Sequence, residues 1–541
     1  MSLSKTKKIS LVQLVWLGFN ITLGIGYVVT FKDIVSGPSG VGYWIFFVII
    51  SGALLAGGIA WGFARLSEIF YDKNGIAYAA TKNGFGRFGD FFAWVVGFVQ
   101  YLILPLITTQ WILSLFTVAL DVVPWVSKLN VLNLFLHSKE LENVKSVLDK
   151  IKDSEFVDGS FKKTLEQSNL LGSYKHFLNI QDLILNLIGI LIFLFFGFFT
   201  IRKGIKSFHS FANISAFLKW GISGLFMLTT VFLAFNNHLF KTLVKYTYIP
   251  FSSHDQSFFV FLKNFNNAFM VFFYFFLGFE TFSSATRNIH EPAKTIKKAI
   301  FWVLGVSTLI YLFETFFMIG ALGEFNVLNV ANTIAFKGFG MLGIILFFIQ
   351  SIALKINGVA QFSLYGGSVL EQLSEDGYFS KKLQTKHVKH FNHNKYGSFP
   401  FRGAVVYIFT ALIFSVFLIV VPFFFGSSVR EITELLSFST FFYLIIYFFT
   451  LLSCLTMSWK KKLKAKWYED LWWFVSLIFV CYFFGFHFYF ELLEKFSDSQ
   501  GRLTLNGIEM LLFFLIWLFL LVYYCFFIFE WRKKQRVKTN P

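Results

Sequence analysis

Long apolar stretches, each about the length of a bilayer-spanning helix, recur along nearly the whole chain. A spanning helix needs about 20 mostly apolar residues. Twelve segments meet this length, at about 9–31, 43–70, 90–120, 180–200, 208–235, 258–284, 299–322, 338–370, 403–425, 432–457, 469–490 and 507–530. Because the bilayer core offers no water to the backbone, such segments fold as helices. The sequence therefore predicts an all-α integral membrane protein with twelve transmembrane helices.

The composition agrees with a chain buried in lipid. Of the 541 residues, 56% are hydrophobic and 14% are charged, whereas soluble proteins carry about 25% charged residues. Phe accounts for 79 residues, which we interpret partly as the codon usage of an AT-rich bacterial genome. The three cysteines, Cys454, Cys481 and Cys525, form no Cys-x-x-Cys pair, so we expect neither a disulfide framework nor a metal site. The first apolar run contains no small-residue cleavage site before Lys32, so we expect a spanning helix rather than a removed signal peptide.

Lysine and arginine residues gather in every second predicted loop. If the N-terminus is cytoplasmic, these are the loops that should be basic. They carry Lys73, Lys82 and Arg87; Arg202, Lys203 and Lys206; Lys294, Lys297 and Lys298; Lys381, Lys382, Lys386 and Lys389; and the run at 459–466. The pattern predicts an even number of spans in the plasma membrane, with both termini cytoplasmic. It also explains the net charge of +18 by contact with lipid headgroups, without a nucleic-acid partner.

One predicted outer loop, residues 124–178, is long and polar, with nearly equal numbers of acids and bases. Within it, Val144, Val147, Leu148 and Ile151 share one helical face, which predicts a short amphipathic helix. A lid, a partner contact and a tolerated surface insertion all remain open for this segment, and surface loops accept insertions cheaply.

A single carboxylate interrupts the sixth apolar run. Gly278 is followed closely by Glu280, and a polar, basic exit with Pro292 comes after them. A charge inside a membrane span is costly and by default indicates function. A glycine beside it lets the helix open and present backbone groups to a ligand. Glu280 is either a proton site or a structural partner for backbone amides and a positive neighbour.

Two glycines also lie near the middle of the first apolar run, where Gly24 and Gly26 flank Ile25. Paired small residues in a membrane helix can serve close helix packing. They can also mark an unwound segment whose free amides face a carboxylate. Because the first and sixth spans correspond in two five-helix halves, matching glycine interruptions favour the second interpretation.

Several segments, in order, resemble the amino acid–polyamine–organocation family of permeases. The sixth span carries Phe276-Leu277-Gly278-Phe279-Glu280, and the first carries Gly24-Ile25-Gly26, where the family has a small residue in place of Ile25. Further similar stretches are Ala64 to Glu68, Asn74 to Tyr78 with Phe85-Gly86, Glu375-Asp376-Gly377, and Glu434 to Thr440. The chain lacks the family's proline before Asn74 and the Ser-Arg pair of the eighth helix. The matches extend from about residue 15 to 455.

The resemblance implies a single polytopic domain over 1–540 with a LeuT-like fold. Two inverted five-helix repeats would occupy 9–236, with the insertion 124–178, and 257–457, followed by two additional helices in 468–530. The substrate's carboxylate would meet amides of Gly24, Ile25 and Gly26. Its ammonium would meet the broken sixth helix at Phe273, Tyr274, Phe275, Leu277 and Gly278, with the Tyr274 ring covering it or simply packing.

Other charged residues lie in or next to the spans. The resemblance implies that Lys219 takes the place of a sodium ion and that its protonation is coupled to transport; the alternative is a lysine that snorkels to the cytoplasmic face. Glu314 and Lys355 are expected either to pair or to line the pathway. Arg65 and Glu68 share a helix face, and we expect a gate or a structural network there.

These features lead to a secondary transporter of an amino acid, driven by protons or by exchange, with no cofactor. The sequence does not distinguish between amino acids of any charge and polyamines or other organic cations as the substrate, and it does not determine the oligomeric state. A membrane enzyme is disfavoured because no phosphate loop, His-Glu-x-x-His or Gly-x-Ser-x-Gly motif occurs. His387, His390 and His393 are interpreted as part of a solvated basic loop. A membrane sensor without transport activity remains an alternative.

Overall fold

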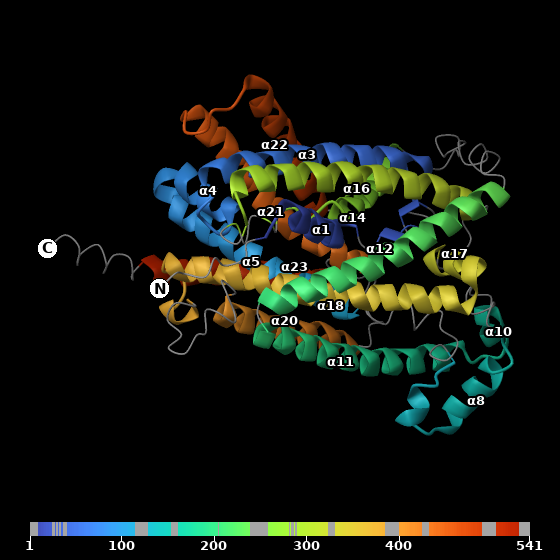
Figure 1. Ribbon diagram of the computed structural model, residues 1–541. Helices are drawn as coiled ribbons and strands as arrows, with labels where there is room; N and C mark the ends of the chain where they lie inside the picture. The colour runs from blue at the N-terminus through green and yellow to red at the C-terminus, as the bar shows by residue number, and fades with distance from the viewer. Residues whose placement is uncertain are drawn as a thin grey trace.

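The computed structural model describes residues 9–23, 27–28, 31, 34–35, 40–113, 128–152, 161–203, 205–237, 258–280, 282, 286, 289–322, 330–384, 400–424, 432–489 and 505–529. Nearly all of these residues are helical (Figure 1). Each of the twelve predicted spans overlaps one helix, from 12 residues in α1 to 35 in α18. These are α1 (Leu11–Thr22), α3 (Ile45–Ile69), α5 (Gly89–Leu113), α11 (Leu171–Lys203), α12 (Ile205–Asn236), α14 (Phe258–Tyr274), α16 (Pro292–Leu322), α18 (Met341–Glu375), α20 (Phe401–Phe424), α21 (Ile432–Trp459), α22 (Trp467–His487) and α23 (Leu505–Tyr523).

Short elements connect the long helices. They are η1 (Gly42–Trp44), α4 (Ile76–Gly84), η2 (Gly86–Phe88), η3 (Leu132–Leu134), α8 (Lys139–Leu148), α10 (Phe161–Gln167), α17 (Val330–Phe339), η5 (Lys381–Leu383) and the π-helical turn η8 (Tyr524–Phe529). Among the described residues, eight helices are long and apolar enough to cross a membrane alone, and α1, α20 and α23 supply shorter apolar segments. The chain is therefore a multi-pass membrane protein.

Helices at equivalent positions of the two predicted halves pack against each other. The second and seventh, α3 and α16, lie side by side, as do the third and eighth, α5 and α18, and the fourth and ninth, α11 and α20 (Figure 1). Helix α12 packs between α16 and α18. This pairing is the arrangement expected when two similar halves meet about a pseudo-twofold axis in the membrane plane.

Close packing of α5 on α18 depends on a small residue. The ring of Trp111 stacks on Phe362 with centroids 4.7 Å apart and lies against Gly358. A Cβ atom added at Gly358 would come within 1.4 Å of that ring. Small residues allow this close approach in membrane helices, and α18 is thereby fixed against α5.

The insertion before α11 forms a small helical unit of its own. The side chain of Ser138 caps α8 by accepting a hydrogen bond from the Leu141 amide at 3.1 Å. Val144, Leu148 and Ile151 are buried in a separate apolar cluster with residues of α10 and the start of α11. The predicted amphipathic helix is thus confirmed. Helix α11 begins at Leu171, well before the predicted start at about 180, because its first turns pack on this cluster.

Candidate functional site

The sixth span is interrupted where the sequence predicts. Helix α14 ends at Tyr274, and residues 275–280 form turns in which the Leu277 amide donates to the Tyr274 carbonyl at 3.1 Å. Gly278 has φ +116°, a backbone conformation that side chains disfavour. Helix α1 likewise ends at Thr22, just before the predicted break. Gly24, Ile25 and Gly26 themselves lie outside the described residues.

A tyrosine of α16 connects the ends of both interrupted helices. The Tyr311 hydroxyl donates to the carbonyl of Thr22 at 2.5 Å and to the carbonyl of Phe275 at 3.1 Å. The Thr22 hydroxyl also reaches the Leu277 carbonyl, at 3.5 Å. Carbonyl groups at helix ends lack partners within the helix, so Tyr311 satisfies two of them and sets the spacing of the two ends.

The carboxylate of Glu280 caps the turn of the sixth span. Both of its oxygens accept from the Gly278 amide at 3.0 Å, and Oε2 accepts from the Tyr447 hydroxyl, also at 3.0 Å. Glu280 is 2% exposed, and the ring of Tyr447 stacks on Phe279. This geometry matches the interpretation of Glu280 as a partner for backbone amides. Phe273, Phe275 and Leu277 are buried around it, whereas Tyr274 is half-buried.

Lys219 reaches inward rather than toward the cytoplasmic surface. The side chain on α12 is 3% exposed, and its Nζ donates to the Phe19 carbonyl of α1 at 2.7 Å. The same ammonium lies 5.8 Å from the centre of the Trp220 ring. These contacts exclude snorkelling and place one cation within two turns of the end of α1.

The acidic residue of α16 lies near Lys219, and of the two alternatives for Glu314 and Lys355, the described residues do not show pairing with each other. Glu314 and Lys219 line the same cavity and attract each other, without a direct ion pair. No ion pair joins Glu314 to Lys355 in the part of the chain that the structure describes, and Lys355 does not line that cavity. The reason is the packing of α12 between α16 and α18, which brings the Lys219 side chain to Glu314.

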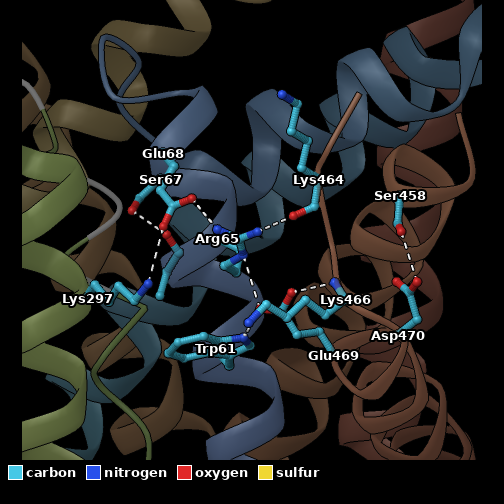
Figure 2. A network of polar contacts seen from close by, with 11 residues as sticks. Trp61, Arg65, Ser67, Glu68, Lys297, Ser458, Lys464, Lys466, Glu469 and Asp470 are labelled. Atoms are coloured by element: carbon cyan, nitrogen blue, oxygen red, sulfur yellow. Dashed lines mark hydrogen bonds and ion pairs between the residues drawn. The ribbon is translucent and has the colours of Figure 1, made fainter. Parts of the chain in front are cut away.

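Arg65 and Glu68 belong to a polar network near the C-terminal end of α3 (Figure 2). Arg65 forms an ion pair with Glu68 and another, at 3.3 Å, with Glu469 of α22. Lys297 of α16 lies 3.5 Å from Glu68. The Trp61 indole donates to Glu469 at 2.7 Å. The network thus connects α3 and α16 to α22. A role as a gate or as a structural network stays a prediction.

A second polar contact joins two of the segments that carry the family resemblance. The Tyr78 hydroxyl of α4 donates to Asp376 at the end of α18, and Lys82 lies 3.2 Å from the same carboxylate. Burial opposes the ionisation of Asp376, but the Tyr78 hydrogen bond and the charge of Lys82 outweigh it and lower the pKa of Asp376. The Asn74 amide also donates to Gln372 at 3.3 Å.

Sequence reasoning missed Tyr311 and Tyr447, two of the phenols that bond to the interrupted segments. A buried hydroxyl usually has a hydrogen-bond partner, and Tyr311 lies three residues before Glu314, so this spacing was an available signal. Gln350 was also missed; its side-chain amide donates to Ser223 at 2.5 Å and to the Lys219 carbonyl at 3.3 Å. Among the described residues no cluster of potential metal ligands occurs, and the histidine loop at 385–399 is not described.

The packing of equivalent helices and the break after α14 define the LeuT fold. Two solved structures share it. One is a manganese transporter of Eremococcus coleocola in complex with an aromatic bis-isothiourea substituted compound, with 12% identity, 99% of each chain covered and a TM-score of 0.50. The other is MhsT in complex with L-phenylalanine, with 12% identity, 87% of this chain and 97% of that chain covered and a TM-score of 0.51. At this identity the likeness concerns the fold.

The chain belongs to the amino acid permease family, whose model matches residues 9–520. This confirms the resemblance that the ordered motifs indicate, and with it a transporter rather than an enzyme. No match to a curated protein sequence was found.

Proposed function

We propose that this protein is a secondary active transporter that moves amino acids across the plasma membrane by alternating access, with both termini in the cytoplasm. The observation that carries the proposal is the hydroxyl of Tyr311, which connects the carbonyl ends of α1 and the sixth span. A single side chain thereby aligns the two interruptions at which an amino acid's charged ends would bind. The family and the fold support the same function.

In this proposal the substrate lies between the two interruptions. Amides of Gly24 to Gly26 take its carboxylate, and carbonyls of the segment Phe273 to Leu277 take its ammonium. The positive end of the half-helix that follows the first break stabilises the bound carboxylate. Tyr274, half-buried next to these carbonyls, covers the substrate, and the contact of Glu280 with the Gly278 amide holds the second interruption open.

Lys219 provides the coupling to protons in this proposal. Its ammonium donates to the Phe19 carbonyl near the end of α1, so loss of the proton removes a charged contact between α12 and α1. Such a contact forms in one state of the helix bundle and breaks in the other, which is how a bound proton biases alternating access. An exchange mechanism without net proton movement is the alternative drive.

Uptake into liposomes tests this function. Purified protein is reconstituted into vesicles preloaded with unlabelled amino acids, and entry of each labelled amino acid is followed with and without an inward proton gradient. Exchange or gradient-driven entry is the expected result, and Lys219→Ala should lose only the gradient response. Folded protein that moves no amino acid or polyamine would refute the proposal, and binding without flux would identify a sensor.

A further inference from the structure

A small cavity with several polar residues in its wall lies beside the predicted break of α1. It has a volume of about 40 Å³ and lies among α12, α16 and α18, with Leu23 and Val28, on either side of the predicted break of α1, in its wall. A water molecule needs roughly 10–15 Å³ of such volume. The space therefore suits one compact ionic group or roughly three waters. Its polar lining consists of Lys219, Ser223, Tyr311, Glu314 and Gln350.

The charged groups in this cavity differ in what they already bind. The Lys219 ammonium donates to the Phe19 carbonyl at 2.7 Å and is thereby committed to α1. The carboxylate of Glu314 has no hydrogen bond or direct ion pair with any described residue, and the buried Oε1 of Gln350 also lacks a partner there. An acidic group in a membrane span without a partner is costly. Two acceptors without a hydrogen bond to any described residue therefore face the cavity, which also has the Lys219 ammonium and the hydroxyls of Ser223 and Tyr311 in its wall.

The acceptors lie within reach of a bound amino acid. Tyr311, which donates to the carbonyls of Thr22 and Phe275, is three residues before Glu314 and lies on the same face of α16. Both residues line the cavity. A substrate whose carboxylate and ammonium lie at the interruptions would thus direct its side chain along Tyr311 toward Glu314.

We propose that Glu314, with Oε1 of Gln350, binds a cationic group at the end of the substrate's side chain, so that the transported substrate is an α-amino acid with a terminal ammonium. The inference rests on the proposed function and specifies its substrate. A compact ammonium suits the volume of the cavity better than a planar guanidinium does. The ring of Tyr311 adds an aromatic face to the same wall.

Uptake of L-lysine and of L-norleucine, its neutral analogue, tests the proposal in the same liposomes. The wild type should prefer lysine by about tenfold or more, since hydrogen bonds to charged groups are among the stronger ones. Glu314→Gln should remove this preference by lowering kcat/KM for lysine about tenfold while norleucine uptake stays within about twofold. Glu142→Gln, which removes an exposed carboxylate of α8, serves as the control and should change neither.

Several results would overturn the proposal. A wild type that transports norleucine as well as lysine overturns it without any variant. An unchanged preference in Glu314→Gln, or loss of the proton response alone, makes Glu314 a counter-ion of Lys219. If Glu314→Gln fails to fold, Glu314→Asp keeps the charge and should still prefer lysine; equal uptake of both refutes the assignment. Absence of any amino acid flux refutes the proposed function instead, so the two failures are distinguishable.

Discussion

Replacing Tyr311 by Phe tests whether one hydroxyl aligns the two interrupted helices. The change removes two hydrogen bonds, at 2.5 and 3.1 Å, and leaves the carbonyls of Thr22 and Phe275 without this donor. The ring and its edge contacts with Tyr27 and Phe272, at 5.2 and 5.3 Å, are kept. The one hydroxyl hydrogen is shared by the two carbonyls, and leaving these buried acceptors without it costs about 2 kcal/mol. If the bonds serve substrate binding, KM should rise by up to about 30-fold.

The assay combines liposome uptake kinetics with thermal unfolding in detergent. Tyr407→Phe is the matched control, because that buried hydroxyl bonds to Thr108 of α5 and contacts neither interruption. The control should lose about 1 kcal/mol of stability with an unchanged KM. The reasoning fails if Tyr311→Phe keeps the wild-type KM, or if Tyr407→Phe raises KM as much.

Three further changes test other parts of the structure. The pKa of Asp376 is lowered in the folded state. Its carboxylate therefore stabilises the protein at pH values above its ordinary pKa of about 3.9, and this contribution is lost as the pH falls through the lower pKa of the folded state. In melting curves measured against pH, the difference in melting temperature between wild type and Asp376→Asn should disappear only at acidic pH. Glu469→Gln deprives Arg65 of a buried partner and should cost about 3 kcal/mol, seen as a lower melting temperature, and no change would show that the network is dispensable. Leu148→Ala opens the buried cluster of the insertion at a cost of about 3 kcal/mol; faster proteolysis within α8 and α10 with unchanged uptake is expected, and reduced uptake would give the insertion a part in transport.

Interruption of the sixth span was predictable because its cause is local. In this apolar run Gly278 adopts the positive φ of the turn. The carboxylate of Glu280, two residues later, accepts the hydrogen bond of the Gly278 amide that the break frees. The start of α11 was not predictable in the same way. Residues after Leu171 are too polar for lipid, and they stay helical because Tyr174 and Phe177 pack into the cluster of the insertion.

Partners of the buried charges depend on tertiary packing, which spacing along the chain does not encode. Hydropathy places Lys219, Glu314 and Lys355 in three different spans. Burying each charge in the membrane costs free energy that a polar or oppositely charged partner must offset. Which two of these side chains come close depends on how α12, α16 and α18 are rotated about their axes and on their relative depth in the membrane. Of the two alternatives expected for Glu314 and Lys355, pairing with each other is not shown by the described residues for this reason, although both residues were correctly placed in membrane helices.

In the proposed mechanism, substrate recognition by Glu314 and proton coupling by Lys219 would take place in the same cavity, which both residues line. The ammonium of Lys219 holds α1 through the Phe19 carbonyl, and the carboxylate of Glu314 lies on the helix that also carries Tyr311. A cation bound at Glu314 would neutralise the charge that attracts Lys219. By Coulomb's law, losing this attraction favours release of the proton from Lys219, and so its separation from α1. Substrate binding and proton release are therefore expected to be linked, and the same linkage requires that a proton on Lys219 weakens binding of a cationic substrate.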